Sequence, residues 1–185
     1  TLKIIDVLTN GTFNCIDKDN KLITNTNDPI KCERIELSNN ITINGYGLTW
    51  NDTSKPYTIS LSGEIVFDGK NNTIFLKDCS GWQGLIKSDS DSSNNRPTIS
   101  NIDISGSNTH LSLTNDGYGT SYLMRYGSIH FNLENCHNYI EIKDASYCSG
   151  LVPSYQDIEN SFINITGCSN HGHISNSNYA GGICG

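Results

Sequence analysis

Apolar residues recur at every second position in several short segments of this chain. The pattern is clear at 41–43, 102–104 and 111–113, where two Ile or Leu residues flank a polar residue. Alternation with a period of two is typical of a half-buried β-strand. A further short strand is predicted at 65–67 (IVF), and Asn-Gly, Asp-Gly and Ser-Gly pairs at 44–45, 68–69 and 105–106 predict turns after the strands at 41–43, 65–67 and 102–104. The sequence therefore predicts an all-β fold built from short strands.

Two segments in the second half of the chain repeat each other. Residues 129–151 match residues 161–183 at an offset of 32, with identity at six of the 23 positions, including Cys136 with Cys168. A more divergent copy ends at Cys79, because Ile74 and Leu76 stand five and three positions before it, as apolar residues do before the other two cysteines. These spacings predict that Cys79, Cys136 and Cys168 occupy equivalent positions.

In a β-solenoid the chain winds into successive coils, and each coil repeats the same strands in the same order. Equivalent strands of neighbouring coils then stack in parallel at about 4.8 Å. A two-sheet sandwich is the alternative, and it predicts antiparallel hairpins with tight turns. The offset of 32 residues favours a parallel β-solenoid over residues 41–185. Residues 1–40 fit the repeat poorly, and we interpret them as an N-terminal capping segment.

Composition and charge narrow the possible partners. The chain has 12 Lys and Arg against 19 Asp and Glu, a net charge of −7, and its cations are mostly scattered singly. Nucleic-acid binding needs clustered cations, so we expect no nucleic-acid partner. No apolar stretch approaches the length of a membrane span. The 24 Asn and 23 Ile against two Ala agree with a β-rich fold.

Seven cysteines are many for a reduced cytosolic protein of 185 residues. Cys15 and Cys32 are our candidates for a bridge in the capping segment. Cys79, Cys136 and Cys168 should form one column, in which neighbours either form a disulfide or stack as free thiols. Five Asn-x-Thr sequons permit N-glycosylation, at Asn10, Asn40, Asn51, Asn71 and Asn164.

The C-terminal sequence resembles the GLUG-type repeat. The resemblance lies in residues 165–174 (ITGCSNHGHI) and 179–185 (YAGGICG), and residues 65–74 with 82–85 look like the coil that commonly precedes such arrays. It covers about residues 60–185. It implies a right-handed parallel β-helix like those of bacterial adhesins and of surface or virion proteins of giant viruses, and it carries no catalytic residues to transfer.

Candidate chemistry is sparse along the chain. Cys168, His171 and His173 have the side-chain types of a zinc site, but the other copy has Tyr139 and Glu141 at the histidine positions, so a structural interpretation is favoured. We expect no metal and no cofactor. A tyrosine cluster lies outside the repeat and is the candidate contact surface: Tyr118, Tyr122 and Tyr126.

These observations favour a non-catalytic structural or adhesive module of an extracellular fibre, a cell surface or a virion. The alternative is a polysaccharide lyase or glycoside hydrolase on the same fold. Glycans or host-surface molecules are the expected ligands. The sequence ends on a complete repeat unit, so we also expect self-association or further repeats at its C-terminal side.

Overall fold

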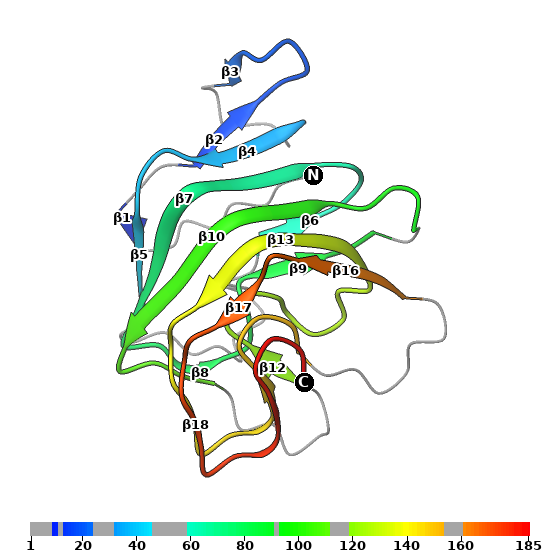
Figure 1. Ribbon diagram of the computed structural model, residues 1–185. Helices are drawn as coiled ribbons and strands as arrows, with labels where there is room; N and C mark the ends of the chain where they lie inside the picture. Colours follow the sequence, from blue (N-terminus) through cyan, green and yellow to red (C-terminus); the bar gives the residue numbers. More distant parts are fainter. Residues whose placement is uncertain are drawn as a thin grey trace.

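Parallel β-strands stack into a β-solenoid of about four turns (Figure 1). The structure is a computed structural model that describes residues 9–10, 13–23, 32–45, 59–90, 93–111, 119–153 and 161–185. Within these ranges the regular secondary structure consists of β-strands. The predicted all-β solenoid is therefore confirmed.

Each coil contributes its first strands to one large sheet, which runs from β4 to β16 and β17 in parallel pairings. Residues 129–133, which a sandwich would pair antiparallel with 161–165, instead run parallel to them, with Phe131 opposite Ile163. The strands of this sheet are β4 (Arg34–Leu37), β5 (Ile41–Asn44), β7 (Val66–Lys77), β10 (Thr98–Ser107), β13 (His130–Asn138), β16 (Phe162–Thr166) and β17 (Ser169–Asn170).

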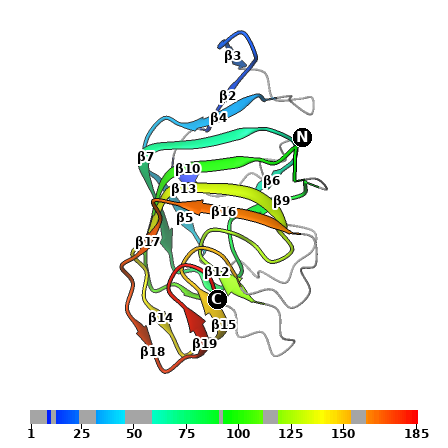
Figure 2. The same cartoon turned by 45° about the vertical axis from the view of Figure 1, so that its right-hand side comes forward.

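The rest of each coil forms smaller parallel sheets, several of which lie below β13 and β16 in the view of Figure 2. One sheet has three strands, β12 (Thr120–Ser121), β15 (Ser146–Ser149) and β19 (Asn178–Gly181). The others are pairs: β8 (Ser80–Trp82) with β11 (His110–Leu111), β14 (Ile142–Lys143) with β18 (Ile174–Ser175), and β6 (Ile59–Leu61) with β9 (Ile86–Ser88).

The pairing becomes antiparallel at the N-terminal side of the large sheet. Strand β2 (Phe13–Ile16) pairs with β4 and with β3 (Leu22–Ile23), and β1 (Thr9–Asn10) pairs with β5. A disulfide joins Cys15 to Cys32, as the sequence predicts. The capping role of residues 1–40 and the right-handed winding stay predictions.

The core consists of columns of apolar side chains that cross the coils. Ile35, Phe67, Ile99 and Leu133 pair in register from β4 to β13, and all four are buried. Ile165 continues this column in β16 and is half-buried. Side chains alternate between the two faces of a strand. Each column therefore fills the interior, and the neighbours of its members along each strand point to the other face of the sheet.

A bend divides the long strands, and we call it the first bend. It lies at Asn101, Asn135 and Gly167 in three successive coils, each with a positive φ, and at residues 69–71 in β7. A single left-handed residue changes the chain direction while ladder pairing continues on both sides. The predicted turn at 68–69 lies at the start of this bend, whereas the predicted turn at 105–106 is wrong, because both of those residues continue the ladder of β10.

Candidate functional site

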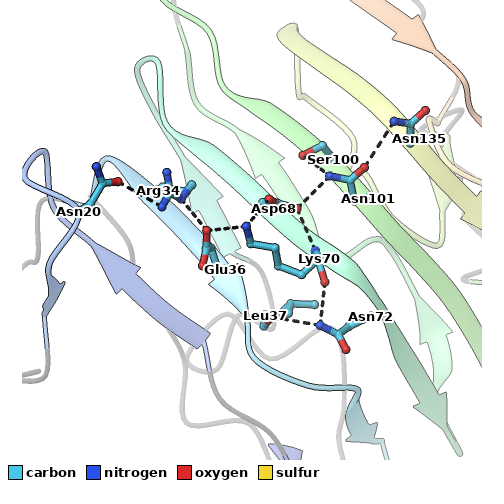
Figure 3. Close-up of polar contacts among 11 residues, drawn as sticks. Asn20, Arg34, Glu36, Leu37, Asp68, Lys70, Asn72, Ser100, Asn101 and Asn135 are labelled. Atoms are coloured by element: carbon cyan, nitrogen blue, oxygen red, sulfur yellow. Dashed lines mark hydrogen bonds and ion pairs between the residues drawn. The ribbon is translucent and has the colours of Figure 1, made fainter.

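A row of polar side chains crosses β4, β7, β10 and β13 near the first bend (Figure 3). Glu36, Asp68 and Asn101 each stand between two buried residues of their strands, so they face outward. We call this set the polar row, and it comprises Asn20, Arg34, Glu36, Asp68, Lys70, Asn101 and Asn135.

Charges of opposite sign alternate along the polar row. Glu36 Oε1 lies 2.7 Å from Arg34 Nε and 2.9 Å from Lys70 Nζ, and Lys70 Nζ lies 3.3 Å from Asp68 Oδ2. The hydrogen bonds to Glu36 and Asp68 raise the pKa of Lys70. Since Glu36 belongs to β4 and Lys70 to β7, the Lys70–Glu36 ion pair connects adjacent coils, whereas the other two pairs lie within one strand.

Amide groups continue the row to the next coils. Asn101 Nδ2 donates to Asp68 Oδ1 at 3.0 Å, and Asn135 Nδ2 donates to Asn101 Oδ1 at 3.4 Å. Partial burial of Asp68 acts to raise its pKa, but the hydrogen bonds from Asn101 and Lys70 outweigh burial and the net pKa lies below 3.8. A carboxyl group of this kind stays ionised at neutral pH, so it is poorly suited to act as a general acid.

Sequence reasoning did not find the polar row as a unit. Its members come from different coils, and each of them is an ordinary polar residue in its own segment. One signal links three of its members, because an Asp or Asn recurs beside the first bend at Asp68, Asn101 and Asn135. That recurrence can be recognised only when the strand register is known.

Two of the three aligned cysteines lie together. Cys136 and Cys168 are free thiols on neighbouring coils, and the backbone N–H of Cys136 donates to Cys168 Sγ at 3.4 Å. They stack as thiols, which is one of the two predicted arrangements.

Cys79 does not belong to this column, and its predicted equivalence is wrong. The register places Cys136 opposite Ile102, which in turn lies opposite Asn72, seven residues before Cys79. The backbone N–H of Cys79 donates instead to Thr109 Oγ1 at 3.4 Å. The same local spacing of apolar residues before a cysteine thus recurs at two different corners of the coil.

The candidate zinc residues do not converge. His171 Nε2 lies 2.8 Å from Ser169 Oγ, and its ring stacks on Tyr139 with centroids 4.8 Å apart. His173 Nδ1 instead lies 3.8 Å from Glu141 Oε1. Within the described ranges, no three His, Cys, Asp or Glu side chains are grouped so that they could hold a metal ion.

The tyrosine cluster is not a continuous contact surface. Tyr122 is buried, with 1% of its surface exposed, and its hydroxyl donates to the Glu141 carbonyl at 2.7 Å. The prediction is therefore wrong for Tyr122, whose ring packs in the coil interior. Tyr126 is half-buried, and Tyr118 lies outside the described residues.

Three of the five sequon asparagines have exposed side chains: Asn40, Asn71 and Asn164. Asn40 Oδ1 also accepts a hydrogen bond from the backbone N–H of Thr73 at 2.8 Å. Asn51 and the side chain of Asn10 lie outside the described part of the chain.

In comparisons with other proteins, no protein-family model, curated protein or solved structure matches this chain. The strand register alone therefore shows the solenoid. In the part of the chain that the structure describes, no helix has the length and apolar character needed to cross a membrane.

Proposed function

We propose that this chain is a non-catalytic structural or adhesive β-solenoid module displayed on an extracellular fibre, a cell surface or a virion. The observation that carries the proposal is the polar row. Its charged groups are paired with one another, within β4 and β7 by Arg34–Glu36 and Lys70–Asp68 and between these strands by Lys70–Glu36, so they form a fixed polar surface that also links adjacent coils. This use of charge suits a scaffold better than an active site.

The disulfide and the sequons support an external location. The Cys15–Cys32 disulfide is of a type that persists in oxidising compartments. Exposed Asn40, Asn71 and Asn164 stand in sequons that would accept glycans in a secreted protein. The resemblance to GLUG-type repeats points the same way, because such repeats occur in adhesins and in surface proteins.

Stacked aromatic pairs between the last two coils support an adhesive role. Tyr147 and Tyr179 stack with ring centroids 4.8 Å apart, and 74% of Tyr179 is exposed. Tyr139, which stacks on His171, is 47% exposed. Exposed aromatic rings next to polar groups suit contact with glycans. Glycans, host-surface molecules and neighbouring copies of the solenoid are the partners that we propose.

The rival function is cleavage of a polysaccharide. It would require a carboxyl group that changes its protonation state during turnover. Asp68 is bound to Lys70 and accepts a hydrogen bond from Asn101, and these contacts lower its pKa and favour its ionised form. This carboxylate is therefore better suited to structure than to acid–base catalysis.

The test compares wild type with Asp68→Asn and with Asp89→Asn as a matched control. Asp89 is also paired with a lysine, Lys87, at 2.9 Å, but 42% of its side chain is exposed and it lies outside the polar row. Each protein is incubated with acidic and neutral polysaccharides, applied to a glycan array and heated in a circular dichroism cell. We expect no cleavage product from any of them, and a lower melting temperature for Asp68→Asn than for the control.

Binding of wild type to glycans or to intact cells would identify the adhesive form of the proposal. Self-association without such binding would identify the structural form. Product release by wild type that is lost in a folded Asp68→Asn protein would overturn the proposal in favour of the enzyme.

A further inference from the structure

Cys136 and Cys168 occupy successive positions of one interior column, in β13 and directly before β17. Equivalent residues on adjacent parallel strands lie about 4.8 Å apart, which is inside the Cα separation of about 4.4–6.8 Å that a disulfide needs. Both thiols are free, Cys136 is fully buried and Cys168 is half-buried. The pair therefore combines a sheltered sulfur with one that small molecules can reach.

The two sulfurs have different acidities because they share hydrogen bonds. The hydrogen bond from the Cys136 thiol, aided by the Cys136 backbone N–H, lowers the pKa of Cys168 to about 7. Burial raises the pKa of Cys136 well above its usual value, and its contact with Cys168 adds to this effect. At neutral pH a large share of the molecules therefore carries a thiolate on Cys168, while Cys136 stays a thiol.

We propose that Cys168 and Cys136 form a dithiol site that reacts with low-molecular-weight disulfides and closes a covalent bond between the last two coils. This inference is independent of the function proposed above. It assigns Cys168 as the attacking sulfur and Cys136 as the resolving sulfur.

The reaction is a balanced thiol–disulfide exchange. The Cys168 thiolate attacks one sulfur of the external disulfide, whose S–S bond breaks, and the first small thiolate leaves and takes up a proton. Cys136 then gives its proton to solvent and attacks Cys168 Sγ, which releases the second small thiolate. Two protein thiols are oxidised to one disulfide, and one external disulfide is reduced to two thiols.

The other free cysteines lack this arrangement. Cys148 lies opposite Ala180 and Cys184 lies opposite Val152, so neither has a cysteine at the paired position in the adjacent coil. Burial raises the pKa of both. Burial also raises the pKa of Cys79 to about 11.

Cys184 provides an internal reference, because it is exposed whereas Cys168 is half-buried. If exposure decided reactivity, Cys184 would react first. At pH 7 a thiol of pKa 7 is about half ionised and a thiol of pKa above 9 is about 1% ionised or less, a ratio of about 50. The lower intrinsic nucleophilicity of the more acidic thiol reduces this ratio, and we expect Cys168 to react about fivefold faster with oxidised glutathione.

The experiment treats the folded chain with oxidised glutathione and follows it by intact mass and non-reducing peptide mapping. Wild type should acquire a Cys136–Cys168 disulfide. Cys136→Ser should stop at a glutathione adduct on Cys168, Cys168→Ser should form neither product, and Cys184→Ser should behave as wild type. Cys136→Ala should also move the pH midpoint of the Cys168 reaction upward, because the hydrogen bond from the Cys136 side chain is lost.

Three results would overturn the proposal. One is faster modification of Cys184 than of Cys168 in wild type, a ratio that needs no variant and is therefore unaffected if a variant fails to fold. The second is a mapped disulfide that joins different cysteines, and the third is a Cys168 adduct that persists in wild type without resolution by Cys136.

Discussion

The buried amide of Asn138 allows a direct test of how this solenoid is held together. Asn138 interrupts the apolar column formed by Ile41, Ile74 and Ile104, and it is fully buried. Its Nδ2 donates to the Ile140 carbonyl at 2.9 Å, and its Oδ1 accepts from the Ile140 N–H at 3.2 Å. The amide therefore satisfies both backbone groups of a residue that is itself 5% exposed.

The size of the effect follows from these two hydrogen bonds. Asn138→Ala leaves the N–H and the carbonyl of Ile140 buried without that amide, and each unsatisfied group costs about 1–3 kcal/mol. At about 1.5 kcal/mol each, the free energy of unfolding falls by about 3 kcal/mol. For a chain of this length, this corresponds to a melting temperature lower by about 6–12 °C.

Asn170 is the comparison variant, because it occupies the same position in the next coil, where its Oδ1 accepts a hydrogen bond from Asn138 Nδ2 at 2.7 Å. Its Nδ2 also donates to a backbone carbonyl, that of Gly172 at 2.9 Å, but Asn170 is half-buried and water can replace it. We expect Asn170→Ala to cost about 1 kcal/mol. Asn138→Ile would extend the apolar column, yet it should be about as destabilising as Asn138→Ala, because it supplies no polar partner for Ile140.

Urea unfolding followed by circular dichroism measures all three variants. Equal losses for Asn138→Ala and Asn170→Ala would refute the reasoning, because burial would then not matter. A stabilised Asn138→Ile protein would refute it as well, since apolar stacking would then outweigh the hydrogen bonds.

Three further predictions concern pH, the disulfide and close packing. Since the pKa of folded Asp68 lies below 3.8, its carboxylate stabilises the fold above that pH, and the contribution is lost as the pH falls through the folded value. In urea titrations the stability difference between wild type and Asp68→Asn should shrink below pH 3.8, and a constant difference would contradict the linkage. Replacing Cys15 and Cys32 together by serine should cost roughly 3 kcal/mol in the same assay, as expected for a crosslink between residues 17 apart, and an unchanged urea midpoint would argue against the bridge. Gly172→Ala should lower the melting temperature because its Cβ would lie 1.9 Å from the Ile140 carbonyl oxygen, whereas Gly182→Ala, with its nearest atom at 3.7 Å, should be neutral; equal effects would show that the contact at Gly172 relaxes freely.

The sequence predicted the solenoid because two coils have the same length along their whole course. From β13 and β16 to β15 and β19, every paired position lies 32 residues apart. Between β7 and β10 the separation is 32 residues at Phe67 and Ile99 but 30 at Ile74 and Ile104. No single offset aligns these coils, so their repeat is hidden from a comparison of the chain with itself.

The candidate site was harder to predict, because it depends on which corner of the coil a residue occupies. The spacing of apolar residues before Cys79 matches the spacing before Cys136 and Cys168, but it could not identify the corner at which Cys79 lies. Tyr122 has the residue type of a contact surface, and its burial is decided by contacts that the local sequence does not encode. Only the register brings Glu36 of β4 next to Asp68 and Lys70 of β7.

The first bend determines where this architecture can change in length. Between the paired positions on either side of it, the chain uses four residues after Glu36, five after Asp68, and three after both Ser100 and Glu134. The columns on both sides stay aligned despite these differences. A peptide grafted at this corner of the coil would therefore project from the surface while the apolar columns on both sides keep their register, and natural insertions there would diversify the displayed surface while the interior is preserved.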